Sequence, residues 1–132
     1  MARRFIFLSV ALATIFISII ARAGSLALDS AGNLFVGEGH SVIKYAPDGA
    51  ESIFAEGLNC SLGLTFDPNG NLFVADGAVT ATRTNRAILK FATDGTRSTF
   101  ATGISSAGLA CDSAGDLLYR TAIRFLNSRS ME

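Results

Sequence analysis

The chain has 132 residues, of which 49% are hydrophobic, and its 11 basic and 11 acidic residues give a formal charge of zero. With two cysteines, two prolines and 13 glycines, the composition excludes a disulfide-framework miniprotein and a collagen-like chain. A zero net charge also argues against nucleic acid as a partner, because binding to phosphates needs clustered Lys and Arg.

The N-terminal segment carries much of this hydrophobicity. Arg3 and Arg4 precede an apolar run at 5–20, and a small-x-small site follows at 21–23. These features are typical of a secretory signal helix, so we expect a signal peptide at 1–23 and a secreted or periplasmic product. The alternative is an uncleaved N-terminal membrane anchor, because the apolar run is long for a signal and short for a membrane span.

The remaining part, residues 24–132, has the composition of an ordinary acidic domain. Its eight basic and eleven acidic residues give a formal charge of −3. Nucleic acids and anionic membranes both require a basic face. We therefore expect no nucleic-acid partner and, once the signal is cleaved, no membrane association.

An internal repeat follows the signal. The segment Asp29–Val36 recurs at 67–74 with six of eight residues identical, and recurs in weaker form at 112–119. A second unit at 42–58 recurs at 88–104 with eight of seventeen residues identical. The copies are offset by 38 to 46 residues, which is the period of β-propeller blades.

Each period predicts four short strands joined by turns. The turn signals are sequences such as Asp67–Gly70 and Asp94-Gly95, with Gly or Pro where tight turns require them. In the second period the strands are expected at 64–66, 72–74, 88–91 and 98–101. Short strands that repeat four to a period favour propeller blades over a sandwich, whose strands do not repeat in sequence.

The string from Gly63 to Asp76, GLTFDPNGNLFVAD, is followed by Ile88–Phe91 and an Asp-Gly turn. This pattern resembles the blade of NHL-repeat and SMP-30/gluconolactonase-like β-propellers. The resemblance implies an all-β fold of four-stranded antiparallel blades. Blade 1 is expected at about 24–58, blade 2 at about 59–104 and an incomplete blade 3 at about 105–126.

The repeat is shorter than a closed ring. A propeller takes roughly four to eight blades, and the resemblance implies six. An open set of blades leaves sheet faces and strand edges unprotected. We therefore expect either a truncated or fragmentary gene product, or self-association of several copies that completes one propeller.

The loops after the second and fourth strands of each blade open on one face of a propeller, where ligands usually bind. The candidate ligand-binding residues on these loops are Glu38, His40, Asn59, Asp76, Arg83, Asn85 and Arg86. The last three belong to an insertion that makes this loop of blade 2 eight residues longer than that of blade 1. The alternative is an ordinary solvated loop, since Thr, Ala and Asn also suit exposed hairpins.

We assign no catalytic or metal-binding residue from the sequence. His40 is the only histidine, so a His-pair metal site and a two-histidine relay are excluded. The acidic turn that begins at Asp67 lacks the Gly and Glu of a calcium loop, and its polar side chains are expected to bond the turn backbone. Cys60 and Cys111 are expected to be too far apart for a disulfide, with Cys111 a core residue.

Two functions remain. The first is an exported propeller segment that acts as a binding or interaction module for a small molecule or a protein, without catalysis. The alternative, implied by the resemblance, is the remnant of a metal-dependent lactone hydrolase. Such an enzyme holds one divalent metal through Glu, Asn and Asp, so Ca²⁺ or Zn²⁺ would be the cofactor only in that case, and we place none of its ligands on this sequence.

Overall fold

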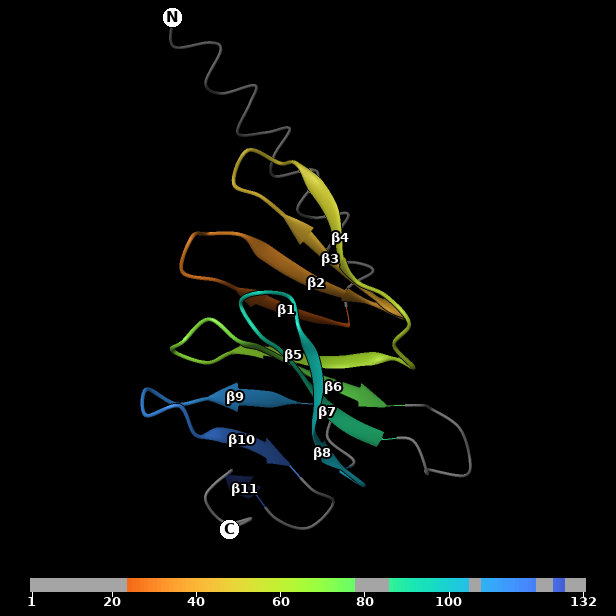
Figure 1. Cartoon of the computed structure of the whole chain (residues 1–132), viewed down its shortest axis with the longest axis vertical. Coiled ribbons are helices and arrows are strands. Elements are labelled where there is room, and N and C mark those ends of the chain that lie inside the picture. Colours follow the sequence, from red (N-terminus) through yellow and green to blue (C-terminus); the bar gives the residue numbers. More distant parts are fainter. Residues whose placement is uncertain (1–23, 78–85, 105–107, 121–124, 128–132) are drawn as a thin grey trace, which may run out of the picture.

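A computed structural model describes residues 24–77, 86–104, 108–120 and 125–127. These residues form eleven strands in three antiparallel sheets and contain no helix (Figure 1). The strands are β1 (Ser25–Leu28), β2 (Leu34–Glu38), β3 (Ser41–Tyr45), β4 (Glu51–Ala55), β5 (Ser61–Phe66), β6 (Leu72–Gly77), β7 (Arg86–Phe91), β8 (Arg97–Thr102), β9 (Leu109–Cys111), β10 (Leu117–Arg120) and β11 (Phe125–Asn127).

The all-β architecture of antiparallel blades is thereby confirmed. The expected signal helix at 1–23 lies outside the described residues. A search of the described part of the chain for a helix long and apolar enough to cross a membrane finds none.

Each sheet is a meander in which neighbouring strands follow one another in the sequence. Blade 1 has the order β1-β2-β3-β4 and blade 2 the order β5-β6-β7-β8, while the described part of blade 3 comprises β9, β10 and β11. Val36 pairs with Ile43 as Val74 pairs with Leu89. The register also shifts at the same place in both blades, just before Ile43 and just before Leu89. The sequence repeat is therefore a structural repeat at the level of single residues.

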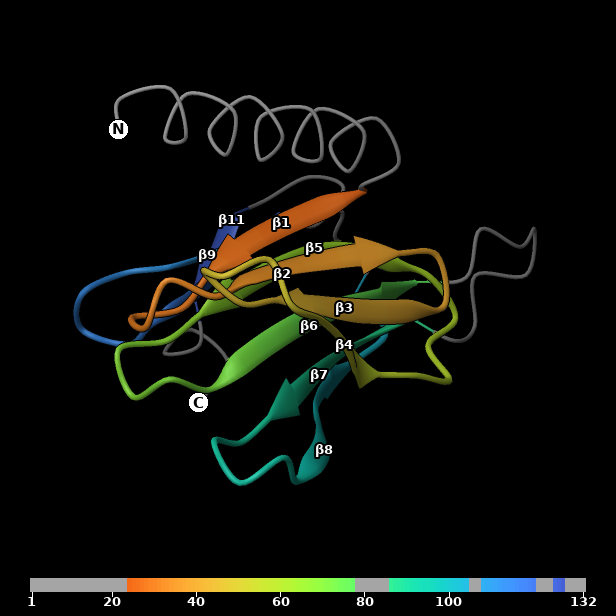
Figure 2. The same cartoon turned by 90° about the horizontal axis from the view of Figure 1, so that it is seen from above.

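The first strand of each blade lies beside the first strand of the next. β5 contacts both β1 and β9, and Figure 1 shows it between them. Figure 2 shows the remaining strands of blades 1 and 2 extending away from these inner strands. This arrangement is that of adjacent blades in a propeller, with the first strand innermost.

The turn between the first and second strands is closed by an aspartate. Oδ1 of Asp29 accepts hydrogen bonds from the backbone N–H groups of Ala31 and Asn33, both at 2.9 Å, and Oδ2 accepts one from Asn33 Nδ2 at 2.7 Å. Asp67 and Asp112 accept backbone hydrogen bonds in the same way. The glycine three residues later has a φ of 80 to 86° in all three turns, a conformation that suits only Gly well. The expected backbone-bonding role of these turns is confirmed.

Blades 1 and 2 pack face to face through two chemically distinct surfaces. We call the side of blade 1 that carries Phe35 and Phe54 its phenylalanine face. The opposing side of blade 2, its leucine face, carries Leu64, Leu72, Val74, Leu89 and Phe91, all buried in one core with Phe35. The Phe35 ring lies 5.0 Å from the Phe54 ring at 86°, an edge-to-face geometry that adds to the stabilisation from burial.

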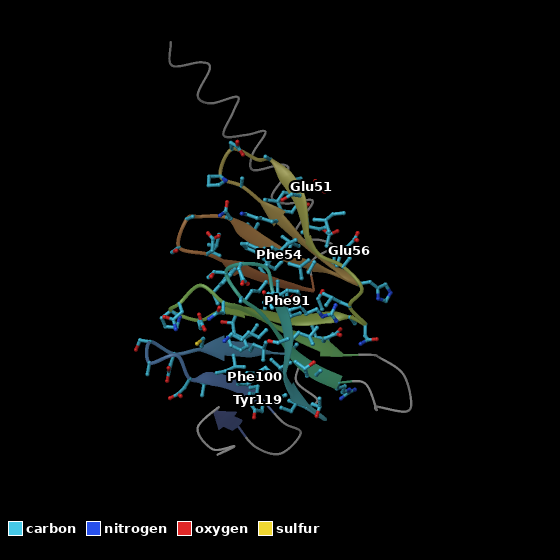
Figure 3. All side chains as sticks on the ribbon, viewed as in Figure 1. Glu51, Phe54, Glu56, Phe91, Phe100 and Tyr119 are labelled. Carbon is cyan, nitrogen blue, oxygen red and sulfur yellow. The ribbon has the colours of Figure 1, made fainter. Side chains whose placement is uncertain are left out.

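The same pairing recurs between blades 2 and 3. Phe73 and Phe100 occupy the positions of Phe35 and Phe54, with ring centroids 5.2 Å apart at 85°. They pack with Leu117 and Tyr119 of blade 3. The rings of Phe54 and Phe91 lie 5.6 Å apart at the first joint, and Phe100 packs against the core that contains Tyr119 at the second. Figure 3 labels these four residues. Blades 1 and 2 thus each present a phenylalanine face to the blade that follows.

Replacing Asp29 with Ala is expected to lower the free energy of unfolding by about 1–2 kcal/mol at pH 7, because three hydrogen bonds to a carboxylate are lost. Desolvation raises the pKa of Asp29, but the hydrogen bonds from Asn33 and Ala31 and the charge of Lys44 outweigh it, so the pKa lies below its usual value. The stabilisation is then present above the unfolded-state pKa of about 3.9 and is lost as pH falls through the folded-state pKa.

Urea denaturation from pH 7 to pH 2.5 measures this effect. The difference between wild type and D29A should shrink at the acid end, and Ser30→Ala in the same exposed turn should change stability little at any pH. A difference that does not vary with pH would contradict this role of the ionised carboxyl group.

Candidate functional site

Two loops of blade 1 join at the end of the sheet opposite the Asp29 turn. They are Glu38–Ser41, between β2 and β3, and Leu58–Ser61, between β4 and β5, and together we call them the loop platform. Leu58 N donates to His40 O at 3.0 Å, and Ser61 N donates to Gly39 O at 2.8 Å. The expectation that these two kinds of loop open on the same face is confirmed for blade 1.

His40 takes part in this junction through its side chain. Its Nδ1 lies 2.9 Å from Leu58 O, and because a carbonyl oxygen only accepts hydrogen bonds, Nδ1 carries the proton. In the neutral ring this leaves Nε2 as a hydrogen-bond acceptor. The residue is exposed, and the structure fixes its ring through Nδ1.

Asp76, on β6, binds the platform loop Leu58–Ser61 through its carboxylate. Asp76 is only 3% exposed. Its Oδ1 accepts hydrogen bonds from Asn59 N at 2.7 Å and Cys60 N at 3.0 Å. Oδ2 accepts a third from Asn59 Nδ2 at 2.9 Å. The carboxylate therefore fixes the backbone and the amide group of an exposed loop residue from within the sheet.

The other predicted site residues are placed differently. Glu38 ends β2, is half-buried, and accepts no hydrogen bond through its carboxylate within the described residues. Arg86 begins β7 and its carbonyl accepts a 2.8 Å hydrogen bond from Gly103 N. Arg83 and Asn85 lie outside the described residues. Of the seven predicted residues, the structure thus places His40 and Asn59 on the platform, bonds Asp76 to Asn59, and places Glu38 in the same turn as His40.

Ser61 is a further member of the platform. It is 2% exposed, and its hydroxyl lies within hydrogen-bond distance of Gly39 O at 3.3 Å and Ser41 O at 3.4 Å. Its sequence signal is the motif Ser-x-Gly-Leu, which opens β5 at 61–64 and recurs at 106–109. A repeated serine at the entry to a blade indicates a role in joining loops.

Gly37 brings two hydroxyl groups close to the platform. A Cβ at this position would lie 2.5 Å from Ser25 Oγ and 2.6 Å from Ser61 Oγ, so a side chain there would clash with both. Ser25 Oγ is buried and has no hydrogen-bond partner within the described residues. Buried hydroxyl groups are normally hydrogen-bonded, so Ser25 offers unused hydrogen-bonding capacity beside the platform.

The thiol groups of Cys60 and Cys111 take no part in the hydrogen bonds described above for the platform. Both are free, in keeping with the expectation that they do not bridge. Burial raises the pKa of the Cys111 thiol, and the charges of Asp67, Asp112 and Asp116 raise it further. The thiol is then protonated at neutral pH, which disfavours it as a nucleophile or metal ligand. Within the described residues, no group of three or more His, Cys, Asp and Glu side chains is arranged to hold a metal ion.

Comparison with known proteins gives fold-level likeness alone. No protein-family model and no curated protein matches the chain. Among solved structures, a candidate gluconolactonase is 19% identical with a TM-score of 0.60, covering 77% of this chain and 42% of its own. A candidate glucose dehydrogenase from Thermus thermophilus is 15% identical with a TM-score of 0.60, covering 75% of this chain and 37% of its own.

A third match is the extracellular domain of a one-component system from B. thetaiotaomicron. It is 15% identical with a TM-score of 0.61, covering 80% of this chain and 15% of its own. The chain thus spans less than half the length of each of these proteins. At such identities the likeness supports a propeller-type fold, in agreement with the blades seen here.

Replacing Asp76 with Ala is expected to lower the free energy of unfolding by about 3 kcal/mol, because a buried charged acceptor of three hydrogen bonds is removed. Hydrogen exchange at the amides of Asn59 and Cys60 should accelerate roughly tenfold or more, since both lose their acceptor. Asp48→Ala is the control, because Asp48 is exposed and accepts one hydrogen bond, from Ala50 N. Unchanged exchange at Asn59 and Cys60 in D76A would show that Asp76 does not hold the loop.

Proposed function

We propose that the chain is an exported β-propeller segment that binds a ligand at the loop platform and does not itself carry out catalysis. The export assignment rests on the signal pattern at 2–23. A structural neighbour that is an extracellular domain is consistent with it. The binding assignment rests on the platform and the side chains that it presents.

One observation carries this proposal: the two loops of the platform are fixed to one another and to the sheet. His40 is bonded to Leu58 through both its backbone and its ring, and Asp76 fixes Asn59 at two points. Binding residues are often found on loops held by a rigid scaffold, and their preorganisation lowers the entropy cost of binding.

The chemistry of the platform favours a small, polar ligand rich in hydroxyl groups. Its candidate ligand-binding groups are the Nε2 acceptor of His40 and the carboxylate of Glu38. The similar structures named for gluconolactone and glucose chemistry suggest a sugar acid or its lactone as the first ligand class to test. The platform's lack of a large apolar side chain at these positions agrees with that choice.

A lactone hydrolase is the second candidate. The likeness to a candidate gluconolactonase favours it, with Ca²⁺ or Zn²⁺ as the metal. Such activity would need ligands that the described residues do not gather in one place. The binding function is therefore the one that the platform supports better.

Gluconate serves as the probe in an NMR titration of the ¹⁵N-labelled full-length chain. Saturable shift changes are expected at the amides of Glu38, His40 and Asn59. His40→Ala should weaken binding by roughly tenfold, the effect of losing about one hydrogen bond. Asp94→Ala, in an exposed turn at the opposite end of the sheet, should leave the affinity unchanged.

The same preparations distinguish binding from catalysis. Hydrolysis of glucono-1,5-lactone is followed with and without added Ca²⁺ or Zn²⁺, and the rate should match the uncatalysed background. Metal-dependent turnover above background would replace the binding proposal with the hydrolase. Shift changes confined to the Asp29 and Asp67 turns, or none at all, would refute a gluconate site at the platform.

A further inference from the structure

His40 is held on the platform by two hydrogen bonds that do not depend on the charge of its ring. Its backbone carbonyl accepts a hydrogen bond from Leu58 N at 3.0 Å, and its ring Nδ1 donates one to Leu58 O at 2.9 Å. Nδ1 carries a hydrogen both in the neutral ring that makes this bond and in the imidazolium ion. Protonation therefore adds a hydrogen at Nε2 and leaves both bonds to Leu58 in place.

Glu38 is the charged residue that shares the turn with His40. It pairs with Ser41 across the turn, and only Gly39 separates it from His40 in the sequence. Glu38 and His40 together carry a formal charge of −1 when the imidazole is neutral, because the carboxylate is then unbalanced. Protonation of the imidazole brings this charge to zero. The turn thus changes its charge by one unit while its backbone hydrogen bonds are kept.

The other titratable or charged side chains on or beside the platform, within the described residues, are Glu56, Cys60, Asp76 and Arg86. Carboxyl groups, thiols and guanidinium groups ordinarily change charge outside the range from about pH 5.5 to 7.5. Both oxygens of Asp76 also accept hydrogen bonds from the loop Leu58–Ser61. His40 is the only histidine in the chain, and histidine is the side chain that ordinarily changes charge in this range.

The two forms of His40 suit ligands of different charge. With a neutral ring, Nε2 and the Glu38 carboxylate are both hydrogen-bond acceptors, which suits the hydroxyl donors of an uncharged sugar. A carboxylate ligand then finds only acceptors and a like charge. With a protonated ring, Nε2 is a charged donor, and its hydrogen bond to a carboxylate is roughly twice as strong as a neutral one. The sugar hydroxyl loses one of its two acceptors in the same step.

We propose that His40 is the specificity-determining residue of the loop platform: its neutral ring selects an uncharged, hydroxyl-rich ligand, and its protonated ring selects the anionic sugar acid. This inference rests on the proposed binding function and names how the site distinguishes ligands within that class. The loops keep their arrangement in both states, so the change in preference is one of charge and donor pattern at Nε2.

Two matched ligands test the proposal. D-gluconate and D-glucitol share a hydroxylated six-carbon chain and differ in one end group, a carboxylate against an alcohol. In NMR titrations of the full-length chain, gluconate should bind roughly 3- to 10-fold more tightly at about pH 5.5 than at about pH 7.5. Glucitol should bind roughly 3-fold more weakly at the lower pH. Loosening of the loops in acid would weaken both ligands, so the opposite signs identify His40 as the cause.

His40→Gln provides a neutral polar side chain that does not titrate. In this variant each ligand should bind with the same affinity at both pH values. Glu56→Gln is the matched control, because Glu56 is exposed and precedes the loop Leu58–Ser61 without belonging to the platform; its side chain is labelled in Figure 3. It should retain both pH responses. Hydrogen-exchange protection of the Leu58 amide, which bonds the backbone of His40, verifies that the loops stay joined in each protein.

A measurement without ligand tests the same assignment. A long-range ¹H–¹⁵N spectrum of the imidazole should show the neutral ring protonated on Nδ1, and protonation on Nε2 instead would overturn the inference. So would gluconate affinity that does not vary between the two pH values, or a pH response that persists in H40Q, and both results would leave the binding function standing. Absence of binding by gluconate and glucitol at either pH would refute the binding function and this inference together.

Discussion

The structure depends on one packing interaction, the docking of a phenylalanine face onto a leucine face. The Phe35 ring is the centre of the first joint, because it makes edge contacts with Phe54 of its own sheet at 5.0 Å and with Phe66 of the next at 4.9 Å. A single four-stranded sheet has two apolar faces and cannot bury both alone. Packing of successive blades solves this problem one face at a time.

The same joint positions the candidate site. The Leu58 side chain is 4% exposed and belongs to the core between blades 1 and 2, while its backbone N–H and C=O groups both bond to His40. Burial of one side chain in the joint thus fixes the loop that holds the imidazole. The platform therefore depends on blade packing. A substitution that weakens packing in the joint would also weaken the hydrogen bonds that hold His40, even though no platform side chain is altered.

Sequence patterns predicted the parts of the structure that repeat. The Asp29 turn, the strand order and the pairing of apolar columns all follow from turn chemistry and alternation, which act over a few residues. The network around Asn59 and Asp76 could not be predicted, because its members are 17 residues apart and depend on how β6 meets the incoming loop. The contact of Ser61 with Gly39 could not be predicted for a similar reason, since Gly39 belongs to the neighbouring blade.

The sequence repeat does not predict that equivalent residues make equivalent hydrogen bonds, as Glu38 and Asp76 show. Each is the fifth residue of the second strand of its blade. Sequence treats them as two candidate ligand-binding carboxylates. The structure shows that Asp76 uses both oxygens to hold the loop that enters its own blade. Glu38 is half-buried, and the segment that would correspond to that loop lies before residue 24, outside the described residues. Equivalent positions thus differ in the hydrogen bonds that they make within the described structure.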